Sequence, residues 1–299
     1  MDGHHYRVGV VLLDLNQREL TADLINLLAD VRRSLIASQS HISLKVVLLE
    51  NGANPVGVTE AEWLRVHVPG SNIGCAGGRN VGISILQQWG VDHLIILDND
   101  IRFPVDDFRD FLNLSENLKR SILAPKLINA DGSVWSQGGI RRGPGSYKQL
   151  GDDANHAGNS IITWAPGACL SFSARVWNDV GPFEKRLTFY FEDIEWCLRA
   201  SLSDIDVVVT SNIKFVHHAN ASMGGPQSRI RTFLWARNNA ALTFWLDPLG
   251  HLTLMAAPAW IRSLSGTSRR ASLLIRAASV LGVAFPLDRF VHRLSLIHI

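Results

Sequence analysis

Two carboxylates that follow an apolar stretch are the residues best suited to bind a metal ion. Asp98 and Asp100, with Asn99 between them, come directly after the strand-like run at 93–97. Two carboxylates one residue apart at a strand end can both turn toward one cation. Mg²⁺ or Mn²⁺ would complete its coordination shell there with water and phosphate oxygens. The triplet therefore predicts a metal site, although an Asp- and Asn-rich turn gives the same pattern.

Two further groups could bind the metal or an anion. His217 and His218 follow the apolar run 213–216, and because neighbouring side chains on a strand point to opposite faces, only one of them is expected to bind the metal. We assign that role to His217, while a structural histidine is the alternative. Arg237, followed by Asn238, could pair with a diphosphate, or could lie on a solvated helix face.

A glycine-rich segment, NIGCAGGRNVG, occupies residues 72–82. Glycines allow the backbone to approach a ligand closely, and a helix beginning near Arg79 would point its N–H groups at an anion. The segment contains neither GxGxxG nor the Lys-Ser/Thr of a phosphate loop, which disfavours a dehydrogenase or an ATPase. Tight packing of a helix against a strand is the alternative explanation.

Acidic residues follow three aromatic residues in the segment FYFEDIEW, residues 189–196. Glu192 and Asp193 stand at an expected helix start, where acids also occur because they offset the helix dipole. The aromatic side chains could form an apolar wall that raises the pKa of a carboxylate, or could stack on a sugar. The segment therefore predicts a general base at Asp193 or Glu192.

The elements that must position these residues alternate along the first half of the chain. Apolar runs at 8–13, 45–49, 64–68 and 94–97 predict strands, and the segments 19–38 and 79–89 predict helices. Such alternation is typical of a parallel, doubly wound sheet, in which ligands bind beyond the carboxyl ends of the strands. A helix is expected near 192, and strands at 207–209 and 213–216. Residues 1–228 are expected to form the main domain and 229–299 a helical extension.

Composition narrows the function classes. With 299 residues and 46% hydrophobic residues, the chain can bury a large core. The net charge of +2 gives no signature of nucleic-acid binding. Three distant cysteines fit a reducing compartment, and we find neither a signal-peptide pattern at residues 1–7 nor a long apolar run. We therefore expect a cytoplasmic protein.

The order of these motifs resembles the family-2 glycosyltransferases with a GT-A fold, in particular the bacterial rhamnosyltransferase-like branch. The resemblance covers residues 8–238 and rests on the 72–82 segment, the Asp98–Asp100 triplet, the 190–200 segment, residues 217–222 and Arg237. It implies an α/β fold with a doubly wound, mostly parallel sheet and a helical C-terminal extension. The activity implied is inverting transfer of a sugar from a nucleotide-diphosphate donor to a polysaccharide or lipid-linked glycan.

The resemblance also implies roles for individual residues. Asp193 matches the catalytic base, with Glu192 beside it. Asp98, Asp100 and His217 match positions at the metal, Mg²⁺ or Mn²⁺. The positions implied for the nucleotide sugar are Leu13, Asn16, Glu50, Asn51, Asn72, Gly74, Gly77, Gly78, Asn80, Asp98, Asn99, Gly167 and Arg237.

The sequence departs from the family at two strand ends. Glu50 stands where the family more often has Asp, and residues 14–16 differ from the usual aromatic-Asn ending. The expected donor is dTDP-rhamnose, with galactofuranosyl or hexosaminyl transfer as alternatives. A non-catalytic sugar-nucleotide-binding protein is the alternative from another class. A processive synthase would carry a Gln-x-x-Arg-Trp motif, and a nucleotidyltransferase a glycine-rich basic loop after its first strand; neither occurs here.

The segment 229–299 combines aromatic and apolar residues with scattered arginines. Such a segment could lie in the interface of an anionic membrane, which would make the protein peripheral on the inner face of the cytoplasmic membrane. The alternative is that it packs against the catalytic domain or against a second subunit in a homo-oligomer.

Overall fold

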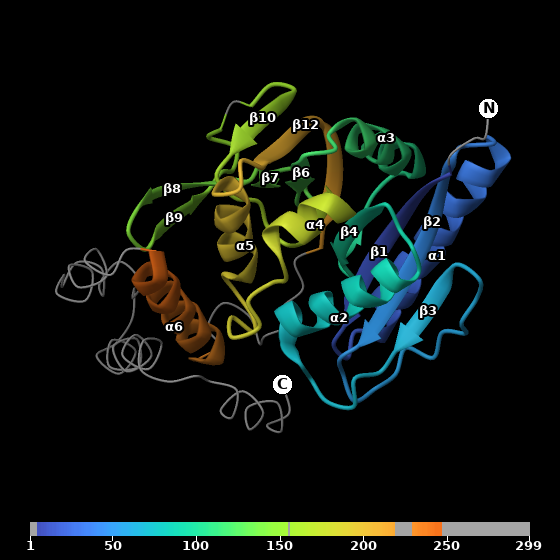
Figure 1. Cartoon of the computed structure of the whole chain (residues 1–299), viewed down its shortest axis with the longest axis horizontal. Coiled ribbons are helices and arrows are strands. Elements are labelled where there is room, and N and C mark those ends of the chain that lie inside the picture. Colours follow the sequence, from blue (N-terminus) through green and yellow to red (C-terminus); the bar gives the residue numbers. More distant parts are fainter. Residues whose placement is uncertain (1–4, 155, 219–228, 247–299) are drawn as a thin grey trace.

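A mixed sheet forms the centre of the protein. The computed structural model describes residues 5–154, 156–218 and 229–246 (Figure 1). Ten strands of this part form one sheet along the path β10-β12-β6-β11-β4-β1-β2-β3, with β5 pairing β12 and β7 pairing β6, while β8 and β9 form a separate hairpin. The strands are β1 Tyr6–Asp14, β2 Ile42–Glu50, β3 Leu64–His67, β4 His93–Asp98, β5 Ile101–Arg102, β6 Ser121–Ile128, β7 Val134–Ser136, β8 Gly139–Gly143, β9 Ser146–Gln149, β10 Asn159–Ile162, β11 Cys169–Ser173 and β12 Asp206–His217.

The half of the sheet built from β4, β1, β2 and β3 is parallel, as the alternating pattern predicts. In β1 the run 8–12 is buried throughout, because helices cover both faces of the sheet. The other half is mixed: β11 runs antiparallel to β4, and β12 runs parallel to β6. The expected α/β fold with a largely parallel central sheet is confirmed.

Helices sandwich the sheet. In α1, Leu24, Leu28, Val31 and Leu35 recur at helical spacing and are buried against one face, with the apolar side of α3 beside them. The helices α2, α4 and α5 cover the other face, where Trp196 of α5 is fully buried. The helices are α1 Arg18–Ala37, α2 Gly74–Gln88, α3 Val105–Asn117, α4 Ala174–Val180, α5 Glu192–Ser201 and α6 Arg229–Leu246.

Helix α2 begins at Gly74 and not near Arg79, so most of the glycine-rich segment is helical. The glycines let this helix approach the sheet closely. A Cβ on Gly82 would lie 2.5 Å from Val11 Cγ1, and one on Gly78 would lie 2.7 Å from Leu13 Cδ2. At Gly78 and Gly82 the glycines therefore serve helix–strand packing.

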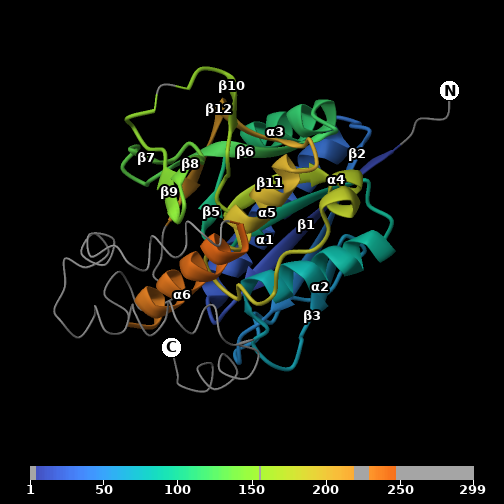
Figure 2. The ribbon, with the colours of Figure 1, turned by 60° about the vertical axis from the view of Figure 1, so that its left-hand side comes forward.

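Helix α6 lies beside α5 and the β8–β9 hairpin (Figure 2). Its Leu234 and Leu242 are buried, and the ring of Trp235 meets that of Phe191 at 5.4 Å. The first part of the 229–299 segment thus packs against the main domain. The remainder of the proposed membrane-facing segment, residues 247–299, lies outside the described residues, and the division at 228/229 stays a prediction.

Candidate active site at the carboxyl ends of the parallel strands

Parallel register brings the polar strand ends together. Asp14 of β1 lies opposite Glu50 of β2, and Leu13 of β1 lies opposite Asp98 of β4. The three strands therefore end at one edge of the sheet, where the sequence places most of its candidate residues.

The Asp98–Asp100 triplet meets His217 at this edge. Strand β5, which follows the triplet, pairs with β12, so that Ile101 lies opposite His217. His217 Nε2 lies 3.3 Å from Asp100 Oδ1, and the backbone N–H of His218 donates to the carbonyl of Asp100. His218 itself is exposed. That only one of the two histidines binds a metal stays a prediction.

The donor set fits a divalent cation. Asp98 is about one-third exposed, at 36%, whereas Asp100 and His217 are nearly buried. His217 Nδ1 is buried and has no hydrogen-bond partner among the described residues. Two carboxylates and an imidazole are ligands that Mn²⁺ accepts. Within the described ranges no three His, Cys, Asp or Glu side chains lie together as a metal site, so only the residue types, and not a preformed geometry, suit a cation here. Mg²⁺ is commonly held by one or two carboxylates, with water and substrate phosphates as its other ligands.

Arg79 lies at the centre of the site, although the sequence interpretation gave its side chain no role. Its side chain is 4% exposed. Nη1 donates to Glu192 Oε1 at 2.9 Å, and Nη2 donates to Asp98 Oδ1 at 3.1 Å and to the carbonyl of Gly167 at 2.9 Å. Burial opposes its charge, but Cys75, Asp98 and Glu192 outweigh burial and raise the pKa of Arg79. A single arginine within a run of small residues is the signal that could have pointed to it.

Glu192 and Asp193 begin α5 after an unusual turn. Tyr190 and Phe191 both have positive φ, at 69° and 71°. This is a left-handed backbone conformation that residues other than glycine rarely adopt. Asn238 of α6 holds this turn, because its Nδ2 donates to the carbonyls of Phe189 and Tyr190. A strained turn, stabilised by Asn238, therefore sets the direction in which Glu192 and Asp193 leave the start of α5.

The two acids differ in environment. Glu192 is buried, and burial followed by the charge of Asp193 raises its pKa to about 7, although Arg79 opposes this shift. Asp193 is partly exposed. Its Oδ2 accepts from the backbone N–H of Gly167 at 2.9 Å, and its Oδ1 accepts from Ile194 N–H at 2.8 Å. Asp193 is therefore the acid of the pair that a bound hydroxyl can reach more easily.

The side-chain amides of Asn51 and Asn72 bind the backbone at the start of α2. Asn51 donates to the carbonyl of Gly74 and accepts from Ile73 N–H, while Asn72 accepts from Gly74 N–H. Gly74 needs its positive φ of 77° and would clash with Thr188 if it carried a Cβ. These bonds fix the start of α2 beside the strand ends.

Asn80 and Gly77, two further positions predicted at the nucleotide sugar, have neighbours within the protein. Asn80 grips the backbone of Phe183 with both ends of its amide, at 2.9 Å each. A Cβ added to Gly77 would lie 3.3 Å from Ile73 Cβ, in the same segment. Asn80 thus ties α2 to the segment after α4, and a role of Asn80 or Gly77 at the nucleotide sugar stays a prediction.

Glu50 and Asn16 shape the loop after β2. Glu50 is buried, and its Oε1 accepts from Val56 N–H at 2.6 Å. Asn16, in a left-handed conformation, accepts from Asn54 N–H at 3.2 Å. Asn99 donates to Thr21 Oγ1 at 2.8 Å and so ties the triplet to α1.

Arg237 is buried on α6, where its guanidinium donates to the carbonyl of Arg186. Its Nε and Nη1 have no hydrogen-bond partner among the described residues, and burial lowers its pKa to about 10. This hydrogen bond is to the segment before α5 and not to the strand ends. A direct role at the diphosphate stays a prediction.

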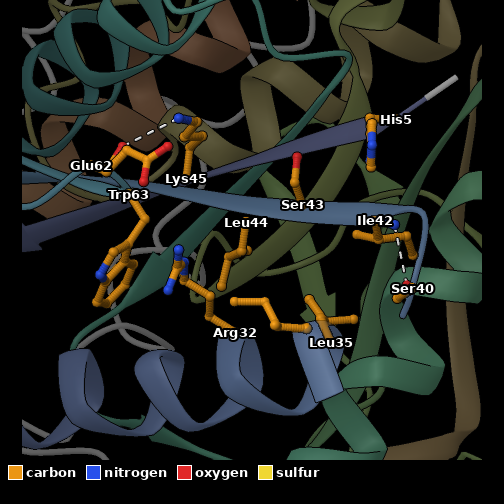
Figure 3. A pocket seen from close by; sticks show the side chains of 11 residues that line it. His5, Arg32, Leu35, Ser40, Ile42, Ser43, Leu44, Lys45, Glu62 and Trp63 are labelled. Atoms are coloured by element: carbon orange, nitrogen blue, oxygen red, sulfur yellow. Dashed lines mark hydrogen bonds between the residues drawn. The ribbon is translucent and has the colours of Figure 1, made fainter. Parts of the chain in front are cut away.

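A surface pocket lies elsewhere, at the amino-terminal ends of β1 and β2 (Figure 3). Leu35 at the end of α1, Ile42 at the start of β2 and Trp63 line it. It contains no candidate residue, and parallel strands bind ligands at their other ends. We therefore keep the carboxyl ends of the strands as the candidate active site.

Comparison with known proteins bears on the fold and on the class of protein. No known family model matches the sequence. The chain is 24% identical over 196 residues to the low-salt glycan biosynthesis hexosyltransferase Agl10 of Haloferax volcanii, and 25% identical over 193 residues to the dTDP-rhamnosyl transferase RfbF of Shigella flexneri. Each match covers 62% of this chain and 63% of the relative, so the chain aligns with less than two thirds of either relative.

Solved structures give the same fold. GalNAc-T7, crystallised with UDP, GalNAc and Mn²⁺, superposes with a TM-score of 0.63 at 11% identity, covering 99% of this chain and 58% of that one. The TarS fragment 1–349 of S. aureus, in complex with UDP, gives a TM-score of 0.50 at 15% identity, covering 93% and 89%. The GT-A fold and the resemblance to rhamnosyltransferase-like glycosyltransferases are confirmed.

Proposed function

We propose that this chain is a metal-dependent, inverting glycosyltransferase that uses a nucleotide-diphosphate sugar. The observation that carries the proposal is the network around Arg79. Arg79 contacts Asp98, which neighbours the Asp100–His217 pair, and it reaches Asp193 through Gly167. Asp98, Asp100 and His217 suit a diphosphate with its cation, and Asp193 suits an acceptor hydroxyl. The two curated relatives, a hexosyltransferase and a dTDP-rhamnosyl transferase, support it.

The reaction needs a base on the acceptor side. Asp193 takes the proton of the acceptor hydroxyl while that oxygen attacks the anomeric carbon, opposite the leaving nucleotide. The bond from the anomeric carbon to the diphosphate oxygen breaks as the new glycosidic bond forms, which inverts the configuration. Gly167 N–H and Ile194 N–H hold the Asp193 carboxylate in place for this step.

The donor side needs charge neutralisation. Asp98, Asp100 and His217 would hold Mg²⁺ or Mn²⁺, which when bound offsets the negative charge that develops on the leaving diphosphate. Asp98 keeps one carboxylate oxygen on Arg79, so its other oxygen can face the cation. The presence of Mn²⁺ with UDP in the GalNAc-T7 structure supports the choice of metal.

The substrates follow from the relatives. We take dTDP-rhamnose as the first donor to test because RfbF is a dTDP-rhamnosyl transferase, with UDP-galactofuranose and UDP-hexosamines next. The acceptor proposed is a polysaccharide or a lipid-linked glycan, reached on the inner face of the cytoplasmic membrane. No helix among the described residues is long and apolar enough to cross a membrane.

A donor panel tests the proposal. Purified protein is incubated with each nucleotide sugar and Mn²⁺ or Mg²⁺, and release of nucleoside diphosphate is measured with and without acceptor glycans. We expect one donor to be hydrolysed slowly and to be consumed faster with an acceptor. Binding without release for every donor would favour a non-catalytic sugar-nucleotide-binding protein instead.

A further inference from the structure

Arg79 joins three parts of the site that are distant in the sequence. It sits on α2, and it contacts Asp98 at the end of β4, Gly167 before β11 and Glu192 at the start of α5. Its guanidinium is buried between two carboxylates, whose negative charges stabilise its positive charge at a position that water does not solvate. A buried cation of this kind holds its partners at fixed distances.

Gly167 connects Arg79 to the acid that we assign as the base. The carbonyl of Gly167 accepts from Arg79 Nη2, and its N–H donates to Asp193 Oδ2, each at 2.9 Å. A Cβ at this position would lie 2.5 Å from Arg79 Nη1, so only glycine allows the guanidinium to come this close. The position of Asp193 therefore depends on Arg79 through one residue.

We propose that Arg79 is a positioning residue that sets Asp193 relative to the donor-binding Asp98. This inference rests on the proposed function. Arg79 touches neither reacting atom in this scheme; it fixes the distance between the acid that receives the acceptor proton and the acid that faces the donor. A misplacement of reacting groups by a fraction of a hydrogen-bond length is enough to slow catalysis strongly.

Lysine cannot replace this geometry. Arg79 uses two nitrogens of a planar guanidinium for three acceptors on three elements, whereas a lysine ammonium is a single point on a flexible stem. Arg79→Lys therefore keeps the charge but loses the fixed separation between Asp98, Gly167 and Glu192. The variant separates positioning from charge.

The same helix that carries Glu192 offers a matched control. Arg199 of α5 pairs with Glu195 and donates to the carbonyls of Val180 and Pro182, without contact to the strand ends. Arg199→Lys thus disturbs an arginine that also binds one carboxylate and backbone carbonyls. Arg199 is more exposed than Arg79, at 32% against 4%, so thermal unfolding is measured for both variants.

The experiment compares wild type, Arg79→Lys and Arg199→Lys with the donor identified by the panel. We expect Arg79→Lys to lower the transfer kcat by about 10- to 100-fold while the Kd of the product nucleotide with Mn²⁺ changes by less than about threefold. Arg199→Lys should leave kcat within about twofold of wild type, whatever its effect on Tm. Equal kcat in wild type and Arg79→Lys would overturn the inference.

A second variant covers the case in which Arg79→Lys folds poorly. Glu192→Gln keeps the size of its side chain and a hydrogen-bond acceptor for Arg79, but removes the charge. If Arg79 acts through its partners, Glu192→Gln on its own should lower kcat by about 10-fold while the Kd of the product nucleotide with Mn²⁺ changes by less than about threefold. An unchanged kcat in a well-folded Glu192→Gln would contradict the inference, whereas a wild type inactive with every donor would contradict the proposed function itself.

Discussion

The strand β4 carries a polar cluster at each end, and the two clusters differ in kind. At its amino-terminal end, His93 is fully buried in a neutral chain of hydrogen bonds. The Tyr6 hydroxyl donates to His93 Nδ1 at 2.8 Å, His93 Nε2–H donates to Ser171 Oγ at 2.7 Å, and the Ser171 hydroxyl donates to Ser115 Oγ at 2.8 Å. At its carboxyl end, Asp98 is charged, partly exposed and joined to Arg79.

The difference separates a fully paired structural cluster from the cluster that we propose to be functional. The Tyr6 cluster (Tyr6, His93, Ser171 and Ser115) ends at the carbonyl of Phe111, so its donors and acceptors are paired within the core. At the other end, Glu192 Oε2 and His217 Nδ1 are buried without hydrogen-bond partners among the described residues. Unpaired buried polar atoms near the partly exposed Asp98 are compatible with a ligand site, because a bound ligand can supply the missing partners.

The largest expected effect lies at the carboxyl end. Asp100→Ala should reduce transfer to background, because it removes one of two carboxylates expected to hold the cation and leaves His217 without its partner. Activity should also vanish in excess chelator and return with Mn²⁺ or Mg²⁺. Nucleoside diphosphate release measures both effects.

The control for this loss is Asp106→Ala, on the exposed first turn of α3. It should leave turnover unchanged. Full turnover of the wild type in chelator would show that the carboxyl-end cluster needs no metal, and the assignment of Asp98, Asp100 and His217 would fall.

The next effect concerns the base. Asp193→Asn keeps the size and polarity of the side chain but cannot accept the proton, so transfer should fall by about 10²- to 10⁴-fold. Binding of the donor, measured by calorimetry, should change little because Asp193 faces the acceptor. Normal turnover of Asp193→Asn together with an inactive Glu192→Gln would move the base to Glu192.

Local patterns in the sequence are sufficient to predict where the parallel strands end. The apolar runs predict β1, β2, β3 and β4, and because parallel register aligns strand ends, the placement of Asp98 beside Leu13 follows from topology. The start of α5 at Glu192 was also predicted. Contacts between residues far apart in sequence were not predictable in the same way.

Arg79 illustrates that limit. Its partners Gly167 and Glu192 are 88 and 113 residues away along the chain, and no periodicity encodes such a contact. The start of α2 was missed for a related reason. Glycine lowers helix propensity, but at Gly78 and Gly82 close packing against β1 outweighs that cost. Tertiary contacts decided both features.

The Tyr6 cluster should respond to mutation in stability and not in turnover. Tyr6→Phe removes the donor to His93 Nδ1 and leaves that buried nitrogen without a partner, which should lower the free energy of unfolding by about 2 kcal/mol. Chemical denaturation measures the change, and kcat with the identified donor should stay at the wild-type value. A large fall in kcat at unchanged stability would remove the distinction between the two ends of β4.

The smallest expected effect is a difference in pH dependence, and its sign differs between the two ends. Burial lowers the pKa of His93 to about 3, so the unfolded chain binds more protons than the folded one as pH falls below 6.5. Stability from His93 is therefore full above its unfolded pKa and is lost on acidification. Burial and Asp193 raise the pKa of Glu192 to about 7, so the folded chain takes up a proton first and gains stability as pH falls from 7 toward 4.5.

Between pH 7 and pH 5.5 each group should change the free energy of unfolding by about 1 kcal/mol, in opposite directions. The two contributions offset each other in the wild type, so variants are needed to separate them. His93→Gln should become more stable on acidification relative to wild type, and Glu192→Gln should become less stable, in denaturation curves recorded with chelator at both pH values. The remaining carboxylates contribute equally to all three proteins and drop out of the comparison. If the three proteins share one pH dependence, neither buried group titrates as its surroundings require, and the contrast between a neutral end and a charged end of β4 is wrong.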